Sequence, residues 1–206
     1  MSETTFQVYT AASKYASPWV FRDRIRMLLW AVTWSSLCSW TPKPLNSWRI
    51  MWLRVFGCKI TGKPFVHQHA RIQIPWNVIL HDRACVGDRA NLYSLGEIEL
   101  AAGCTVAQEV YLCTGSHDFS APNQPLITAK ITIGVDAFIG ARTFVLPGVK
   151  VGDGAVIGAG SVVTRNMAPW TISVGNPCRP LKTRRSSRCA SELSGDISKD
   201  PTSTSS

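Results

Sequence analysis

The histidine at position 117 is the side chain in this sequence that is best suited to acid–base chemistry. It stands in the segment TGSHDF, near the start of an aperiodic stretch with two prolines, residues 113–130. Imidazole titrates near neutral pH, so it can take a proton from a weakly acidic hydroxyl group. Long loops in compact domains are commonly functional, which favours this histidine over His67, His69 and His81. A lone histidine is more often structural, however, so position alone leaves its role open.

A repeat of six residues follows this stretch and predicts the fold that positions His117. Aliphatic residues return at every sixth position, at Ile133, Ile139, Val145, Val151, Ile157 and Val163. Glycine often stands one position later, and a small or β-branched residue stands four positions later. A period of six fits neither a helix nor a simple alternating strand. It is typical of short strands joined by tight turns, so we predict a parallel β-helix.

The same six-residue repeat, less regular, precedes His117. Its aliphatic positions are Ile60, Val66, Ile72, Leu80, Val86, Leu92, Leu100, Val106 and Leu112. Two slips of two residues interrupt it, one after Val78 and one at Gly96–Ile98. Cys104 falls on a small inward position and is predicted to pack. We therefore expect the β-helix to span residues 58–182, with residues 117–130 leaving it as one long loop.

An apolar, tryptophan-rich segment precedes the repeat and belongs to a predicted amino-terminal region, residues 1–57. Residues 1–18 are predicted to be a loosely held arm, and residues 19–40 and 48–57 to be helical, separated by Pro42 and Pro44. Only 16 uncharged residues lie between Arg26 and Lys43, which is short for a membrane span. Two interpretations remain open: a cap on the first coil, and a helix lying in a membrane interface.

Composition narrows the classes of protein that this chain can represent. The 206 residues carry a formal net charge of +9, which favours anionic ligands or surfaces, although no nucleic-acid motif occurs. The seven cysteines form no CxxC pair, which favours a reducing compartment, and the first eighteen residues lack a signal-peptide pattern. We therefore expect a cytoplasmic location, with peripheral contact at the inner face of a membrane as an extension. Residues 183–206 are predicted to be a basic and then Ser/Thr-rich disordered tail.

These motifs together resemble the hexapeptide-repeat O-acetyltransferases, whose fold is a left-handed parallel β-helix. The segments NLYSLGEIEL, YLCTGSHDF and VGNPCRPLK are most similar to the colanic-acid-type acetyltransferases of exopolysaccharide synthesis, over about residues 40–185. Galactoside-, maltose- or antibiotic-type acetyltransferases are the alternative, and a non-enzymatic β-helix scaffold is a second one. The γ-type carbonic anhydrases share the fold, but they need a second histidine where Pro122 stands, so no metal is expected.

The resemblance implies a site and its ligands. His117 would be the general base that lets an acceptor hydroxyl attack acetyl-coenzyme A directly, at a site between the subunits of a homotrimer. The implied acetyl-coenzyme A residues are Ala141, Ala159, Thr164, Arg165, Gly175, Asn176, Arg179 and Lys182. Asn91 and Tyr93 lie one coil before His117 and are candidates for binding the acceptor, and two roles remain open for Asp118: orienting the acceptor or ending the turn. The acceptor would be a sugar or a glycan precursor. A lipid-linked form is a candidate if residues 19–56 touch a membrane.

Overall fold

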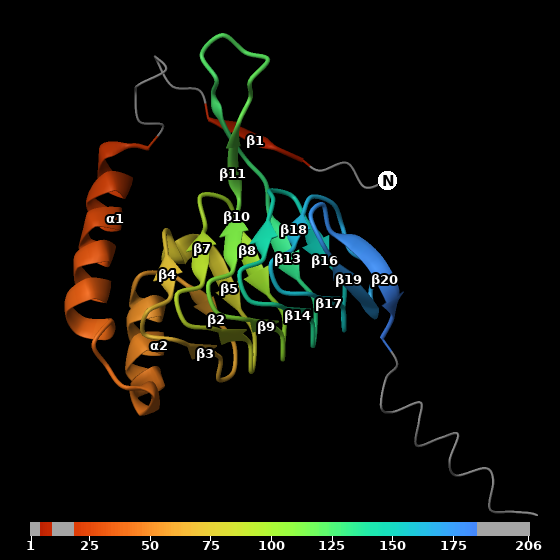
Figure 1. Cartoon of the computed structure of the whole chain (residues 1–206). Coiled ribbons are helices and arrows are strands. Elements are labelled where there is room, and N and C mark those ends of the chain that lie inside the picture. Colours follow the sequence, from red (N-terminus) through yellow and green to blue (C-terminus); the bar gives the residue numbers. More distant parts are fainter. Residues whose placement is uncertain (1–4, 10–18, 185–206) are drawn as a thin grey trace, which may run out of the picture.

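The computed structural model describes residues 5–9 and 19–184, and its main body is a parallel β-helix (Figure 1). Three parallel sheets form its sides. The first sheet contains β2 (Lys59–Ile60), β5 (Val78–Leu80), β8 (Ile98–Leu100), β13 (Ile131–Ile133) and β16 (Lys150–Val151). The second contains β3 (Phe65–Val66), β6 (Cys85–Val86), β9 (Thr105–Val106), β14 (Phe138–Ile139), β17 (Val156–Ile157) and β19 (Thr171–Val174). The third contains β4 (Arg71–Ile72), β7 (Asn91–Tyr93), β10 (Tyr111–Cys113), β15 (Phe144–Val145) and β18 (Val162–Val163).

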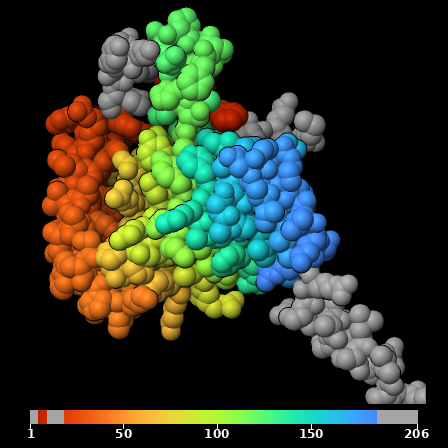
Figure 2. Space-filling model, viewed as in Figure 1, coloured from red at the N-terminus to blue at the C-terminus, as the bar shows by residue number. Residues whose placement is uncertain are grey.

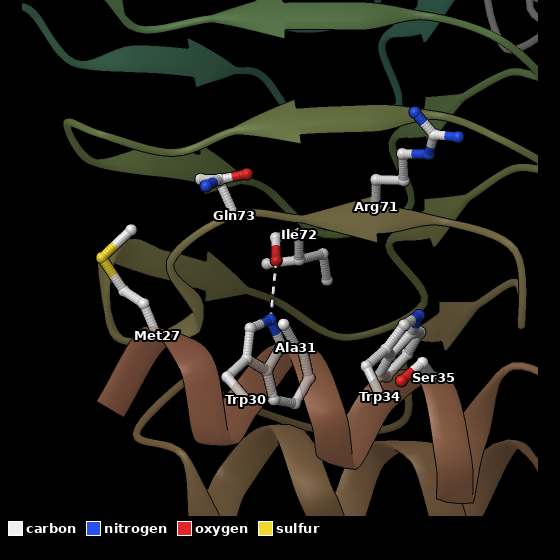
Figure 3. A pocket seen from close by; sticks show the side chains of 8 residues that line it. All are labelled: Met27, Trp30, Ala31, Trp34, Ser35, Arg71, Ile72 and Gln73. Atoms are coloured by element: carbon white, nitrogen blue, oxygen red, sulfur yellow. Dashed lines mark hydrogen bonds between the residues drawn. The ribbon is translucent and has the colours of Figure 1, made fainter. Parts of the chain in front are cut away.

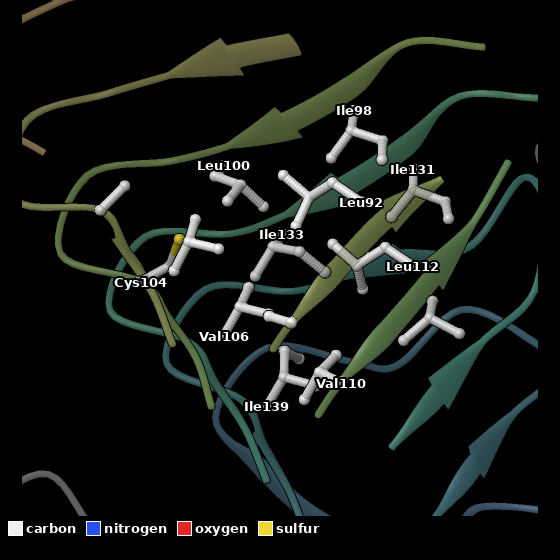
Figure 4. Close-up of a cluster of buried hydrophobic side chains, with 14 of the residues drawn as sticks. Leu92, Ile98, Leu100, Cys104, Val106, Val110, Leu112, Ile131, Ile133 and Ile139 are labelled. Atoms are coloured by element: carbon white, nitrogen blue, oxygen red, sulfur yellow. The ribbon is translucent and has the colours of Figure 1, made fainter. Parts of the chain in front are cut away.

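The aliphatic residues of the six-residue repeat form the core of the β-helix, as predicted. Each stacks on its equivalent in the next coil, as Leu80 does on Leu100 and Leu100 on Ile133. Apart from the half-buried Ile60, all of these positions are buried, and Figure 4 shows some of them, such as Leu92, Leu100 and Ile139, converging from three sides. Cys104 is also buried, and burial raises the pKa of its thiol to about 12, so it packs as an apolar residue.

The irregularities of the repeat all fall at one corner, where the chain passes from the third sheet to the first. The two slips lengthen this corner after β4 and after β7, and the first of them contains the short 3-10 helix η3 (Pro75–Asn77). The aperiodic stretch leaves from the same corner after β10. Its loop is a β-hairpin of β11 (Gly115–His117) and β12 (Leu126–Thr128) that projects from the β-helix (Figure 1).

Two strands depart from the sequence predictions. Within the arm expected for residues 1–18, β1 (Gln7–Tyr9) pairs with β12, because a two-stranded hairpin leaves an edge that a third strand can cover. Pro177 and Pro180 disfavour a regular element in the VGNPCRPLK segment, yet β20 (Arg179–Thr183) pairs antiparallel with β19. Pro180 is accommodated because β20 is an edge strand whose register shifts beside it. The predicted tail beyond Arg184 lies outside the described residues.

The amino-terminal segment is helical and packs on the first coils. It contains α1 (Phe21–Thr33), the π-helical turn η1 (Trp34–Cys38), the 3-10 turn η2 (Lys43–Leu45) and α2 (Asn46–Val55). Trp30 of α1 is buried, and its Nε1–H donates to the carbonyl oxygen of Ile72 in β4 at 2.7 Å (Figure 3). Arg49 of α2 is buried and donates to the carbonyl oxygen of Val66 in β3 at 2.9 Å. Within the described residues, no helix has the length and apolar character needed to cross a membrane.

Candidate functional site

His117 ends strand β11 on the projecting hairpin, and its side chain is exposed. Its imidazole Nδ1 lies 2.8 Å from the carbonyl oxygen of Gln124, across the loop of the same hairpin. A carbonyl oxygen can only accept, so Nδ1 carries a hydrogen, and in the neutral imidazole Nε2 then has the lone pair. Nε2 has no hydrogen-bonding partner in the part of the chain that the structure describes. The hairpin thus presents an oriented imidazole with its basic nitrogen available.

The loop that carries Gln124 is itself held by local hydrogen bonds. The backbone N–H of Asp118 donates to the carbonyl oxygen of Pro125 at 3.0 Å. The carboxylate of Asp118 accepts from the backbone N–H of Ser120 at 2.9 Å and also from its hydroxyl. These bonds to Ser120 lower the pKa of Asp118. Within this chain, therefore, the carboxylate of Asp118 stabilises the turn and does not contact the imidazole.

A ladder of buried hydroxyl groups fixes the base of the hairpin to the β-helix. Ser94 donates to the carbonyl oxygen of Ile74 and accepts from its N–H, both at 2.9 Å. One coil further, Thr114 donates to the carbonyl oxygen of Tyr93 at 2.6 Å and accepts from the N–H of Gly96 at 2.8 Å. Both hydroxyl side chains belong to buried residues. This ladder satisfies backbone groups at the enlarged corner and so positions the strand that carries His117.

Replacing Thr114 by valine tests this ladder. The change keeps the shape of the side chain but leaves the N–H of Gly96 buried without an acceptor, so we expect the free energy of unfolding to fall by about 2 kcal/mol. Urea unfolding measures it. Thr132→Val is the matched control, because the Thr132 hydroxyl makes no hydrogen bond within the described residues. An equal effect of the two substitutions would show that the ladder contributes nothing particular to this corner.

Asn91 and Tyr93 lie on β7, in the coil before β10, but their side chains have different neighbours. Asn91 lines a surface cavity of about 490 Å³ on the third sheet, together with His69, Arg71, Arg89, Glu109 and Tyr111. Tyr93 lies at the hairpin base, where its ring approaches Gly115: a Cβ atom added to that glycine would be 3.5 Å from the ring. Within one chain, Tyr93 is thus the predicted acceptor residue with a contact to β11.

The cavity on the third sheet contains residues that sequence reasoning missed. Arg71, Asn91 and Tyr111 are register neighbours on β4, β7 and β10, and Tyr111 stacks on Phe144 with ring centroids 4.9 Å apart. Their spacing of 20 residues, one coil each, was available in the sequence as a signal. Two of the lining residues are arginines, so the cavity offers positive charge beside an aromatic surface.

The small residues predicted to bind acetyl-coenzyme A meet at one corner, between the second and third sheets. Ala141 and Ala159 occupy equivalent turns of successive coils, and the carbonyl oxygen of Ala141 accepts from Gly160 at 2.8 Å. The turn containing Gly175 and Asn176 joins β19 to β20 and docks beside them, with the N–H of Gly175 donating to the Ser161 hydroxyl at 3.1 Å. A Cβ atom added to Gly160 would contact nothing within 4 Å, so this corner is open.

The polar and basic residues predicted for the same ligand are exposed, but they do not all lie at this corner. Arg179 is the partner of Val174 across the β19–β20 turn, and Lys182 lies further along β20, opposite Ile172. Thr164 and Arg165 follow β18, at the opposite end of that strand from the corner. Arg179 thus lies beside the small residues, where a guanidinium suits the phosphates of a coenzyme, whereas Thr164 and Arg165 lie at another corner of the β-helix.

Among the described residues, one group of side chains could supply metal ligands, and it does not include His117. The ligand atoms of His67, His69 and Asp88 all lie within 4.8 Å of one another. The Asp88 Oδ1 atom is 3.1 Å from Nδ1 of His67 and 3.0 Å from Nδ1 of His69. The His69 imidazole hydrogen-bonds to this oxygen, while Nδ1 of His67 accepts from the backbone N–H of His69 at 3.4 Å. Burial lowers the pKa of His67, and Asp88 partly offsets the change.

Comparison with known proteins agrees with the fold and the motifs. Residues 130–165 match a family model described as the hexapeptide repeat of succinyl-transferase. The chain is 37% identical over 174 residues to a protein of Escherichia coli (strain K12) that is provisionally named colanic acid biosynthesis acetyltransferase WcaF, and the match covers 84% of this chain and 96% of that one. The chain therefore belongs to the hexapeptide-repeat acetyltransferases.

Solved structures show the same fold. A maltose O-acetyltransferase from Clostridium difficile 630 superposes with a TM-score of 0.68 at 26% identity, covering 79% of this chain and 88% of that one. A galactoside acetyltransferase in complex with coenzyme A superposes with a TM-score of 0.67 at 16% identity, covering 93% and 94% of the two chains. The fold is thus the left-handed parallel β-helix of hexapeptide repeats that the resemblance implied.

Proposed function

We propose that this protein transfers an acetyl group from acetyl-coenzyme A directly to a hydroxyl group of a sugar or glycan precursor, with His117 as the general base. The observation that carries the proposal is the His117 imidazole, whose Nδ1 is bound to the carbonyl oxygen of Gln124 while Nε2 is left available. Membership of the hexapeptide-repeat acetyltransferases supports the reaction class, and the coenzyme A complex of a galactoside acetyltransferase supports the donor.

The chemistry follows from the tautomer. His117 Nε2 accepts the proton of the acceptor hydroxyl as its oxygen attacks the thioester carbonyl carbon, and the Nδ1–H bond to Gln124 stabilises the imidazolium that forms. When the tetrahedral intermediate collapses, the carbon–sulfur bond breaks and the sulfur takes the proton from Nε2. The products are an acetyl ester and the free thiol of coenzyme A. No covalent acetyl-enzyme is required.

The donor is proposed to lie along the corner of Ala141 and Ala159. Small side chains there let a pantetheine chain approach the backbone, while Gly175 and Asn176 form the adjacent turn. Arg165, Arg179 and Lys182 would attract the phosphates, with the Thr164 hydroxyl as a further donor. The corner and the hairpin of the same chain lie on different parts of the β-helix, which favours a homotrimer whose sites form between subunits.

The acceptor is proposed to be a sugar, bound by Asn91 and Tyr93 with Asp118 near the hairpin tip. The names of the relatives support this class, because they include a colanic acid biosynthesis enzyme and a maltose O-acetyltransferase. A precursor of an exopolysaccharide is the first choice, since the match to the former covers 96% of that chain. A galactoside- or maltose-type acceptor is the alternative, favoured by the similarity to the maltose enzyme.

A thiol-release assay across a panel of glycans tests the proposal. The full chain is incubated with acetyl-coenzyme A and, one at a time, exopolysaccharide oligosaccharides, galactosides and maltose. We expect thiol release that depends on the acceptor, together with an acetyl ester on the glycan detected by mass spectrometry. Coenzyme A that fails to bind in calorimetry would contradict the proposal and favour a non-enzymatic scaffold.

Enlarging the donor corner should weaken acetyl-coenzyme A binding without harming the fold. Ala159 is exposed, so Ala159→Phe can be accommodated, but the ring would occupy the proposed path of the pantetheine chain. We expect the KM for acetyl-coenzyme A to rise about tenfold or more, because the ring would clash with the pantetheine chain. Ala168→Phe, at an exposed position on a different corner, is the matched control and should leave KM unchanged. Equal KM values for both variants would place the donor elsewhere.

A further inference from the structure

Exposed apolar side chains are concentrated on the helical segment. Of the 20 exposed large hydrophobic residues among the described ones, 12 belong to residues 20–55. We call this set the helical face: Val20, Phe21, Ile25, Leu28, Leu29, Val32, Leu37, Trp40, Leu45, Trp48, Met51 and Val55. The segment stands at one side of the molecule, outside the β-helix (Figure 2). Single exposed apolar residues need no explanation, but such a concentration marks an interaction surface.

The exposed apolar residues of α1 lie on one side of the helix. Phe21, Ile25, Leu28 and Val32 are spaced by four, three and four residues, so they line one stripe of the helix. The opposite side of α1 packs on the β-helix, where Trp30 of α1 and Trp34 at the start of η1 face β4 (Figure 3). The fold therefore uses one side of α1 for packing and leaves a second apolar side exposed. Such a helix needs a partner for its outer side.

The charges around the helical face are almost all positive. Residues 19–57 contain six basic residues and a single acidic one, Asp23. Two of the basic residues serve the fold: Arg49 is buried, and Arg26 lies over the ring of Trp76 at 4.0 Å. The other four are exposed: Arg22 and Arg24 are on α1, which carries the apolar stripe, Lys43 is on η2 and Arg54 is on α2. A second copy meeting the same face would bring like charges together, so a self-interface is disfavoured.

We propose that the helical face docks on an anionic lipid surface, with α1 lying in the plane of the interface. A 13-residue helix is about 20 Å long, and its apolar stripe would enter the headgroup region while Arg22 and Arg24 contact lipid phosphates. Trp40 and Trp48 are exposed, and the Nε1–H of each is bonded to a backbone carbonyl of the segment. Their rings suit the membrane–water interface. This docking concerns the helices alone and does not depend on the acceptor of the acetyl group.

Vesicle flotation with the full chain tests the proposal. We expect the protein to float with vesicles of phosphatidylglycerol and phosphatidylcholine, to float far less with phosphatidylcholine alone, and to be released by salt. Leu28→Ser combined with Val32→Ser should weaken binding by about tenfold or more through lost apolar burial. Arg22→Gln combined with Arg24→Gln should weaken it about 30-fold, from about 1 kcal/mol for each basic residue near an anionic surface.

Two control variants test whether vesicle binding depends on the helical face. Val135→Ser changes an exposed valine in a turn of the β-helix, and Arg83→Gln changes an exposed arginine there, so both should bind vesicles like the wild type. Circular dichroism of each variant confirms that the helices persist. The proposal is overturned if the wild type fails to float with the anionic vesicles. It is also overturned if the helical-face variants and the controls bind alike, or if the Leu28/Val32 double variant dissociates an oligomer in sedimentation, which would assign the face to a second copy.

Discussion

Replacing His117 by alanine is expected to lower kcat for acetyl transfer about 10²- to 10⁴-fold, which is the usual contribution of a positioned general base. The variant removes the nitrogen that accepts the hydroxyl proton and leaves the proposed donor corner intact. The KM for acetyl-coenzyme A should therefore change little, a pattern that marks a group acting in the transition state. Initial rates at varied acetyl-coenzyme A concentration, with a saturating acceptor, measure both constants.

Two further variants sharpen this prediction. His117→Gln can keep a hydrogen bond to the carbonyl oxygen of Gln124 but has no basic nitrogen, so it should be as inactive as the alanine variant. His81→Ala is the matched control, because His81 lies on a coil of the β-helix and contacts Thr61 and Glu99. It should retain nearly full turnover. A fully active His117→Ala enzyme would rule out the proposed base.

Replacing Arg49 by methionine is expected to lower the free energy of unfolding by about 3 kcal/mol or more, since hydrogen bonds from a charged donor contribute about 1.5–3 kcal/mol each. Arg49 is fully buried, and its guanidinium donates to the carbonyl oxygens of Val66 at 2.9 Å and Pro42 at 3.0 Å, and to the Thr41 hydroxyl at 2.8 Å. Without it the carbonyl oxygen of Val66 loses this buried hydrogen bond, and the attachment of α2 to the first coil depends on the bonds of Asn46 to Pro64 and Val66.

Urea unfolding followed by tryptophan fluorescence measures this loss. Arg54→Met, on the exposed side of the same helix, is the control and should change the free energy of unfolding by no more than about 0.5 kcal/mol. Arg49→Lys should be intermediate, because a lysine cannot reach all of these acceptors at once. If Arg49→Met and Arg54→Met were equally stable, the arginine would not be what attaches the helices to the β-helix.

The β-helix could be predicted from the sequence because its core residues recur at fixed intervals along the chain. Each coil needs an aliphatic residue at a fixed position, and Val66, Val86 and Val106 supply it without interruption at one of the three sides. Strands β1 and β20 could not be predicted in the same way. Residues 7–9 have no repeat, and they pair only because the hairpin exposes an edge. Pro180 argues locally against a strand, and only the edge position of β20 makes it acceptable.

The candidate site was predictable in part. His117 stands where the repeat fails, and the resemblance assigns it a role, but its tautomer depends on the carbonyl oxygen of Gln124. Gln124 has a φ of 43°, a left-handed conformation that no local pattern in the sequence announces. Arg71 and Tyr111 were missed because their relation to Asn91 appears only when coils of 20 residues are aligned. Which side chains share this cavity thus depends on the register between coils.

The most direct test of the proposed direct transfer follows the acetyl group itself. The protein is incubated with acetyl-coenzyme A that is radiolabelled in the acetyl group, with and without an acceptor glycan, and is then denatured and separated. Direct transfer predicts that label appears as an alkali-labile ester on the glycan in an amount equal to the thiol released, and that none remains on the protein without the glycan. Label bound covalently to the protein, or thiol release with no ester on the glycan, would contradict it.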